Sequence, residues 1–172
     1  MARVLETERL TLRELEPADA PFIFTLVNQP SWLEYIGDRH VHSLDDARAY
    51  IASGPAASYA KNGFGLWLVS LRDGDVPAGM CGLLRRDTLE HPDIGFAFLP
   101  EFWSQGYAAE AAQGTLRYAR DTLGLGPILA ITSLHNDRSI RLLAKLGFRF
   151  DRVQPSEKGG DVNVYVSDPR SS

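Results

Sequence analysis

The chain opens with alternating polar and apolar residues and then passes into helix-like runs. Residues 9–15 alternate regularly, which predicts a strand with one face exposed to water. A helix is expected to open at Pro17 and to reach about Val27. A second is expected to follow Ser43, whose hydroxyl can cap it, and either to end at about Ala52 or to continue after Gly54-Pro55. Residues 29–43 show neither period and are expected to be irregular.

Strands predominate in the rest of the chain and alternate with two amphipathic helices. We expect strands over residues 65–71, 78–85, 93–99, 128–134, 148–153 and 162–166, and helices over 108–123 and 137–146. Asp73-Gly74 predicts a tight turn between the first two of these strands. The order β-α-α-β-β-β-α-β-α-β-β predicts an α/β fold with a mixed sheet (α+β), helices on both faces and a single domain over residues 1–172.

Gly106 stands where the strand at 93–99 gives way to the helix from 108. At such a junction the first N–H groups of the helix have no intrahelical acceptor, and the helix dipole adds partial positive charge. The junction can therefore hold a phosphate. The sequence contains no Gly-x-x-x-x-Gly-Lys-Ser/Thr, which excludes a nucleotide P-loop, and no Gly-x-Gly-x-x-Gly to support a dinucleotide fold.

Composition narrows the class of protein and of partner. The 172 residues carry a net charge of −4 and no lysine- or arginine-rich tract, which argues against nucleic acid. No apolar run is long enough to span a bilayer and the first residues lack the apolar region of a signal peptide. We therefore expect no membrane partner and a cytoplasmic location. The single cysteine, Cys81, allows no intrachain disulfide and is expected to be a buried thiol.

A second feature lies one strand beyond the glycine junction. Asn136-x-x-Ser139 opens a helix that Leu146-Gly147-Phe148 closes, which taken alone is a capped helix. Together with the junction it resembles the GNAT superfamily of acyl-CoA-dependent N-acetyltransferases, in the RimJ/RimL-like branch that acetylates ribosomal-protein N-termini. The resemblance covers nearly the whole chain. Besides Asn136-x-x-Ser139, it is carried by Thr7-Glu8-Arg9-Leu10-Thr11-Leu12-Arg13, by Asp93-Ile94-Gly95-Phe96 and by the junction itself, Phe102-Trp103-Ser104-Gln105-Gly106-Tyr107-Ala108-Ala109-Glu110-Ala111.

The resemblance implies that acetyl-CoA lies in a V-shaped gap where the parallel strands 93–99 and 128–134 splay apart. Backbone groups around Phe98 and Leu99 would hold the pantetheine arm. Asn136 would bind it too, with Ser139 at the same edge, although helix capping explains both residues as well. The pyrophosphate would take N–H groups from Gln105, Gly106, Tyr107, Ala108 and Ala109. Gln105 replaces a residue that is often basic in relatives, which removes charge but leaves these N–H groups.

The implied reaction is direct attack of a neutral amine on the thioester, so a group must take a proton from the arriving ammonium. Asp93 is the first candidate, because many relatives keep a carboxylate on this strand, and Glu90 and His91 are alternatives. The tyrosine that many relatives use as a general acid is replaced by Leu143, so either Ser139 protonates the thiolate or it leaves unassisted. No acyl-enzyme is expected, and Glu110 is expected to be structural.

The resemblance places the acceptor beside the irregular segment from Pro30 to His42 and the Gly159-Gly160 loop. Candidate acceptor-binding residues are Trp32, Tyr35, Asp38, Arg39, His40 and His42. Core packing would equally explain the two aromatic residues, and a place in a solvated loop would explain the two histidines. No metal site is expected, because His40 and His42 have no third ligand nearby in the sequence.

The acceptor itself stays open at this point. We expect acetyl transfer to a primary amine, either a protein N-terminus or a small molecule such as an amino acid, a polyamine or a drug. A peptide groove would favour the protein acceptor and a closed pocket the small one. A catalytically silent acyl-CoA-binding module is the alternative from another class. The exposed edges of such a sheet are compatible with a homodimer.

Overall fold

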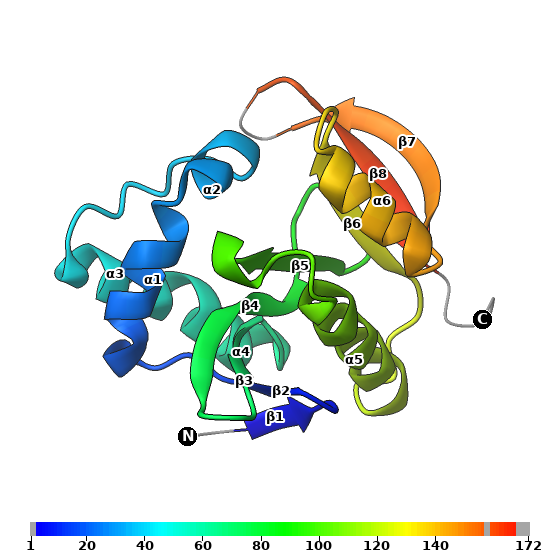
Figure 1. Ribbon diagram of the computed structural model, residues 1–172. Helices are drawn as coiled ribbons and strands as arrows, with labels where there is room; N and C mark the ends of the chain where they lie inside the picture. Colours follow the sequence, from blue (N-terminus) through cyan, green and yellow to red (C-terminus); the bar gives the residue numbers. More distant parts are fainter. Residues whose placement is uncertain (1–2, 157–158, 168–172) are drawn as a thin grey trace.

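The computed structural model describes residues 3–156 and 159–167, which form one eight-stranded sheet with helices on both faces (Figure 1). The strands lie in the order β1-β2-β3-β4-β5-β6-β8-β7. Their bounds are β1 Arg3–Glu6, β2 Leu10–Arg13, β3 Leu66–Leu71, β4 Val76–Leu84, β5 Asp93–Phe98, β6 Ile128–Ser133, β7 Arg149–Pro155 and β8 Asp161–Ser167. Every neighbouring pair is antiparallel except β5 and β6, which confirms the predicted mixed sheet.

The helices follow the predicted order, with one addition. Their bounds are α1 Ala20–Val27, α2 Pro30–Tyr35, α3 Leu44–Ile51, α4 Ala57–Asn62, α5 Tyr107–Asp121 and α6 Asp137–Lys145. The Ser43 hydroxyl caps α3 by accepting from the Asp46 N–H at 3.0 Å, as predicted. A π-helical segment over Ala52–Ala56 joins α3 to α4. None of the helices in the described ranges is long and apolar enough to cross a membrane.

The two faces of the sheet carry separate apolar cores. Helices α1, α2 and α3 lie on one side and α5 on the other (Figure 1). Neighbouring residues of a strand point to opposite faces. On β3, accordingly, Leu68 packs with Ile23 and Ile51 of α1 and α3, and Trp67 packs with Ala111 of α5. We use this alternation below to assign side chains to faces.

The parallel pair β5 and β6 meets only where the two strands begin. A single register pair joins them, Asp93 opposite Leu129, and the Leu129 N–H donates to the Pro92 carbonyl at 2.9 Å. On their outer edges both strands are paired along their whole length, with β4 and β8 respectively. The two strands therefore diverge toward their carboxyl ends (Figure 1), and the predicted splayed pair is confirmed.

Two elements depart from the sequence prediction. The segment expected to be irregular contains α2, a six-residue helix with Pro30 at its first position, where proline is favoured. It is too short to show a helical period. The four-residue edge strand β1 was also missed, because it is half-exposed and pairs only with β2.

Candidate active site

The turn from β5 into α5 presents unpaired amides. Ser104 and Gly106 both adopt the left-handed backbone region, with φ of 63° and 84°. Gly106 is the N-cap of α5 and supplies no capping side chain, so the first helical bond runs from the Glu110 N–H to the Gly106 carbonyl at 3.0 Å. Within the described residues, no acceptor faces the N–H groups of Tyr107, Ala108 and Ala109. These amides are among those to which the resemblance assigns a pyrophosphate.

Arg9 and Thr7 of the opening motif fix the start of α5. The Glu110 carboxylate accepts from the Arg9 backbone N–H at 2.8 Å and from Arg9 Nε at 2.7 Å, and also from the Thr7 hydroxyl. Burial alone would raise the pKa of Glu110, but these bonds hold it below its ordinary value. Glu110 is structural, as expected. Arg9 Nη1 also donates to the Gln105 carbonyl at 3.0 Å, so a guanidinium stands at the turn where Gln105 supplies no charge.

The start of α6 reaches the same turn. The Arg138 guanidinium lies 4.3 Å from the centre of the Trp103 ring. Asn136 caps α6, because its Oδ1 accepts from the Ser139 N–H at 3.3 Å. The capping interpretation of Asn136 is therefore correct, and its amide Nδ2 has no acceptor within the described residues. That nitrogen remains available as a donor, and a role of Asn136 and Ser139 toward a pantetheine stays a prediction.

The inner edge of β5 offers backbone groups to the gap on alternate residues. The Leu99 N–H donates to the Ala78 carbonyl at 3.0 Å and so points toward β4. The Phe98 carbonyl points the other way and accepts from Trp103 Nε1 at 2.9 Å. Because the backbone N–H and C=O groups of successive residues point to opposite edges of a strand, those of Phe96 and Phe98 face the gap. Of the two predicted residues, Phe98 therefore presents its backbone to the gap, whereas the Leu99 amide is used within the sheet.

Asp93 stands at the closed end of the gap. Its side chain is 1% exposed and lies on the face of the sheet opposite α5, and both carboxylate oxygens accept from Arg86 Nε, at 3.0 and 3.2 Å. Burial raises the pKa of Asp93 to about 6, although Arg86 acts in the opposite direction. A carboxylate with this pKa is ionised at neutral pH and is a stronger proton acceptor than an ordinary aspartate.

Glu90 is a weaker candidate for the base. Its side chain is exposed and pairs with Arg152 Nη2 at 3.1 Å. Its pKa lies below the ordinary value, because a backbone hydrogen bond and Arg152 favour the ionised form. Such a carboxylate holds a proton poorly.

Comparison with known proteins decides the family. Residues 9–149 match the Acetyltransferase (GNAT) domain family. The chain is 32% identical to the uncharacterized N-acetyltransferase YoaA of Bacillus subtilis, over 96% of each chain. This chain belongs to the GNAT acetyltransferase family.

Solved structures and a further relative agree with this assignment. An acetyltransferase from Agrobacterium tumefaciens superposes with a TM-score of 0.82 at 25% identity, over 97% of this chain and 94% of that one. RimL, a ribosomal L7/L12 α-N-protein acetyltransferase solved with coenzyme A, has the same fold, with a TM-score of 0.82 over 99% of each chain at 17% identity. The FsC-acetyl coenzyme A-N(2)-transacetylase of Aspergillus fumigatus is 27% identical over 95% of this chain and 75% of its own.

GNAT acetyltransferases use acetyl-CoA, and the residues present fit it. The unpaired amides at the start of α5 match a pyrophosphate. A Cβ added to Gly106 would lie 3.2 Å from Arg9 Nη2, so the glycine lets the guanidinium lie close to the backbone of the turn. At the carboxyl end of β6, the Ser133 hydroxyl is buried and without a hydrogen-bond partner among the described residues. This GNAT domain thus has unused polar groups where β5 and β6 end, on the side where the two strands diverge.

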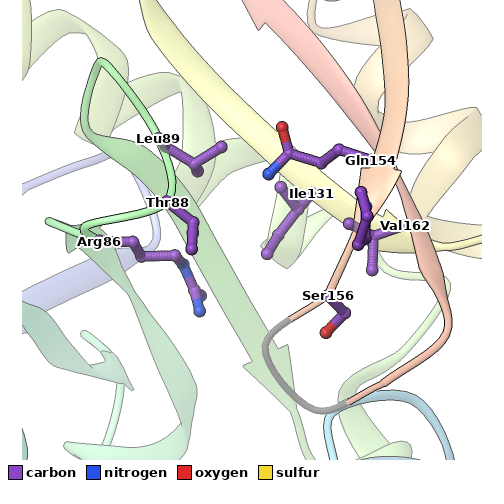
Figure 2. A pocket seen from close by; sticks show the side chains of 8 residues that line it. Arg86, Thr88, Leu89, Ile131, Gln154, Ser156 and Val162 are labelled. Carbon is purple, nitrogen blue, oxygen red and sulfur yellow. The ribbon is translucent and has the colours of Figure 1, made fainter.

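A pocket opens beside Arg86, the hydrogen-bond partner of Asp93, between the β4–β5 connection and strands β6, β7 and β8 (Figure 2). Its polar lining consists of Arg86, Thr88, Gln154 and Ser156, and its apolar lining of Leu89, Ile131, Pro155 and Val162. None of these residues was singled out from the sequence. Ile131 and Leu89 belong to the small apolar cluster on the face that also carries Asp93, so the pocket and the carboxylate lie on one side of this GNAT sheet.

The predicted acceptor-binding residues fall into two groups. Trp32 is buried in the core under α1 and α3, as the packing interpretation has it, although its Nε1 has no hydrogen-bond partner within the described ranges. Tyr35 and His40 are exposed. Their contact with an acceptor stays a prediction.

One argument from the sequence needs correction. The metal site was dismissed because His40 and His42 lacked a third ligand, yet Asp38 brings a carboxylate beside them. The ligand atoms of the three residues lie within 4.8 Å of one another, and all three are exposed.

Cys81 and Leu143 are both internal. Cys81 is fully buried, and burial raises the pKa of its thiol to about 12, which leaves it protonated. Leu143 is buried in the core under α6 and offers no proton donor.

Proposed function

We propose that this enzyme transfers the acetyl group of acetyl-CoA to the primary amine of a small molecule by direct attack, with Asp93 as the proton acceptor. The observation that carries the proposal is a buried carboxylate at the closed end of the gap, on the same face as a side pocket. A protein N-terminus is the competing acceptor. The pocket favours a small one, because it has walls on two sides.

The two ends of the gap would bind different parts of acetyl-CoA. The amides of the β5–α5 turn would hold the pyrophosphate, and the backbone of Phe98 and Phe96 would pair with the pantetheine arm. An arm that follows the inner edge of β5 from this turn ends where β5 and β6 meet. The thioester would therefore come to the same end of the gap as Asp93.

The reaction needs a proton acceptor and little else from the chain. Acetyl-CoA supplies an activated carbonyl with a thiolate leaving group. The amine nitrogen bonds to the carbonyl carbon while the carbon–sulfur bond breaks. Asp93 takes the proton that the nitrogen gives up, directly or through one water. Because a thiol has a pKa of about 8.5, the thiolate is a fair leaving group without an acid. The reaction therefore needs no other proton donor in place of the tyrosine that Leu143 replaces. The role of Ser139 as a general acid stays a prediction.

Thiol release from acetyl-CoA in the presence of an amine panel tests the proposal. A base must be ionised, so the rate should rise with pH through about 6, the pKa of Asp93, and level off above it. Asp93→Asn should lower turnover by about 100-fold or more and abolish this pH dependence, while acetyl-CoA affinity stays within about twofold.

Asp87→Asn is the matched control, because Asp87 is exposed on the same β4–β5 connection. Full turnover by Asp93→Asn would remove Asp93 from the mechanism, and Glu90→Gln and His91→Gln would then be the next variants. If acetyl-CoA binds but neither small amines nor peptides release thiol, the chain is a silent acyl-CoA-binding module. If only peptides release thiol, the small acceptor is wrong.

A further inference from the structure

We propose that the acceptor of this enzyme carries a carboxylate next to its amine, and that Arg86 and Gln154 bind this carboxylate from opposite walls of the pocket. The inference rests on the proposed function, because it names the class of acceptor that the same site takes. The acceptor would be an amino acid or a related amino carboxylate, rather than a polyamine.

Arg86 presents half of its guanidinium to the pocket. Its Nε is used by Asp93, at 3.0 and 3.2 Å. The two Nη nitrogens have no acceptor among the described residues, and the side chain is 29% exposed. Figure 2 shows this end of Arg86 directed toward the pocket between Thr88 and Ser156. Two donors in a fixed planar arrangement are the geometry that binds a carboxylate in a bidentate manner.

Gln154 presents a donor from the facing wall. Its Oε1 accepts from Arg152 Nε at 3.0 Å, and Arg152 is held in turn by Glu90. Because a guanidinium can only donate, this contact fixes which end of the amide is oxygen. The Gln154 Nε2 therefore points away from Arg152, and Figure 2 shows the nitrogen on the side that faces Leu89 and Thr88.

The pocket thus offers donors from both walls over an apolar lining of Leu89, Ile131 and Val162. Net charge does not select the ligand, since Asp93 offsets Arg86. The direction of the polar groups does, because a ligand between two sets of N–H donors must bring acceptor oxygens. A carboxylate meets this need. An ammonium group, such as the far end of a polyamine, would leave every one of these donors unpaired.

The shared guanidinium also relates the carboxylate to the chemistry. In an α-amino acid the amine and the carboxylate are borne by one carbon. An acceptor whose carboxylate binds Arg86 Nη therefore brings its amine to the neighbourhood of the group that binds Arg86 Nε, which is Asp93. One arginine would hold the base and the acceptor together, so it is a positioning and a binding residue at once.

The test compares each amino acid with its own amide, which has the same side chain and amine but no carboxylate. Binding is measured by calorimetry in the presence of coenzyme A, and turnover by thiol release from acetyl-CoA. We expect the acids to bind and to react about 10- to 100-fold better than the amides, the range for a charge-assisted hydrogen-bonded pair.

Gln154→Glu replaces one pocket donor by a charged acceptor of the same size and leaves Asp93 untouched. It should reduce the ratio of acid turnover to amide turnover by about tenfold or more. Arg85→Ala is the control, because Arg85 is exposed and, among the described residues, donates to the Glu90 backbone carbonyl, at 3.4 Å. It should leave the ratio unchanged.

The outcomes separate the two proposals. Amines acetylated with no preference for the acid would overturn the carboxylate inference and leave the proposed function standing. Selective binding of acids without thiol release would support the carboxylate site and remove the proposed function. No binding of any acid would overturn the inference, as would a Gln154→Glu variant with an unchanged ratio.

Discussion

Gly106 allows the pyrophosphate assignment to be tested apart from stability. A residue other than glycine at φ 84° is in the left-handed region, which costs about 1–2 kcal/mol. Gly63, at the end of α4, has nearly the same φ, 78°. The variants Gly106→Ala and Gly63→Ala should therefore lose similar stability, about 1–2 kcal/mol each, and remain folded, because domains of this kind hold about 5–15 kcal/mol.

The two positions differ in what a methyl group meets. At Gly63 nothing lies within 4 Å of an added Cβ, whereas at Gly106 the Cβ would be 3.2 Å from Arg9 Nη2. The end of an arginine side chain can move by a few tenths of an ångström, so the contact itself is inexpensive. The methyl group nevertheless fills space in front of the unpaired amides and keeps an anion from approaching them.

Acetyl-CoA affinity should therefore fall about tenfold or more in Gly106→Ala, which corresponds to about 1.4 kcal/mol, and stay unchanged in Gly63→Ala. Gly106→Asp should bind more weakly still, because it adds a negative charge. Calorimetric titration with acetyl-CoA gives the affinities, and urea unfolding gives the stabilities. Equal affinities in Gly106→Ala and Gly63→Ala would refute the reasoning, whatever the stabilities.

Three further predictions concern other parts of the molecule. Glu110→Gln should lower the free energy of unfolding in urea by about 1–2 kcal/mol, since the carboxylate accepts three hydrogen bonds. The exposed Glu101→Gln should change it little, and equal losses would contradict a structural role. Arg138→Ala should weaken acetyl-CoA binding about three- to tenfold at low salt and less at high salt. Arg141→Ala on the same helix should not, and an effect independent of salt would argue against a charge contribution. Cys81 should react with a thiol reagent only after unfolding, because it is buried with a raised pKa, and rapid labelling of the folded protein would disprove this.

The parts of the fold that the sequence predicted are those with a strong local signal. The hairpin at Asp73-Gly74, the cap at Ser43 and the long helix after Gly106 all depend on residues close together in the chain. β1 and α2 were missed for the opposite reason. Their stability comes from what they pack against, β2 for the one and the core under α1 for the other.

The same distinction divides the site. Gly106 and Asn136 were found because a glycine at a turn and an asparagine at a helix N-cap are recognisable from the sequence around them. Arg86 was not, because its partner Asp93 comes from β5 and the other walls of its pocket come from β6, β7 and β8. Gln154 carries no signal at all, since the orientation of its amide depends on Arg152. One usable signal was overlooked. Alternate residues of β5 direct their backbone N–H and C=O groups toward the gap, so counting along the strand from a paired residue would have separated Phe98 from Leu99.

The two ends of the gap use arginine in the same way. Arg9 pairs through Nε with Glu110 and directs its remaining nitrogens to the turn that would hold the phosphates. Arg86 pairs through Nε with Asp93 and directs its own into the pocket that we propose for the acceptor. In each case the carboxylate fixes the guanidinium before any ligand arrives, so little side-chain freedom is left to lose on binding. Lysine could not take either place, because a single ammonium cannot hold a carboxylate with one edge and offer a planar pair of donors with the other. We therefore expect specificity at both ends to depend on the direction of a guanidinium as well as on charge.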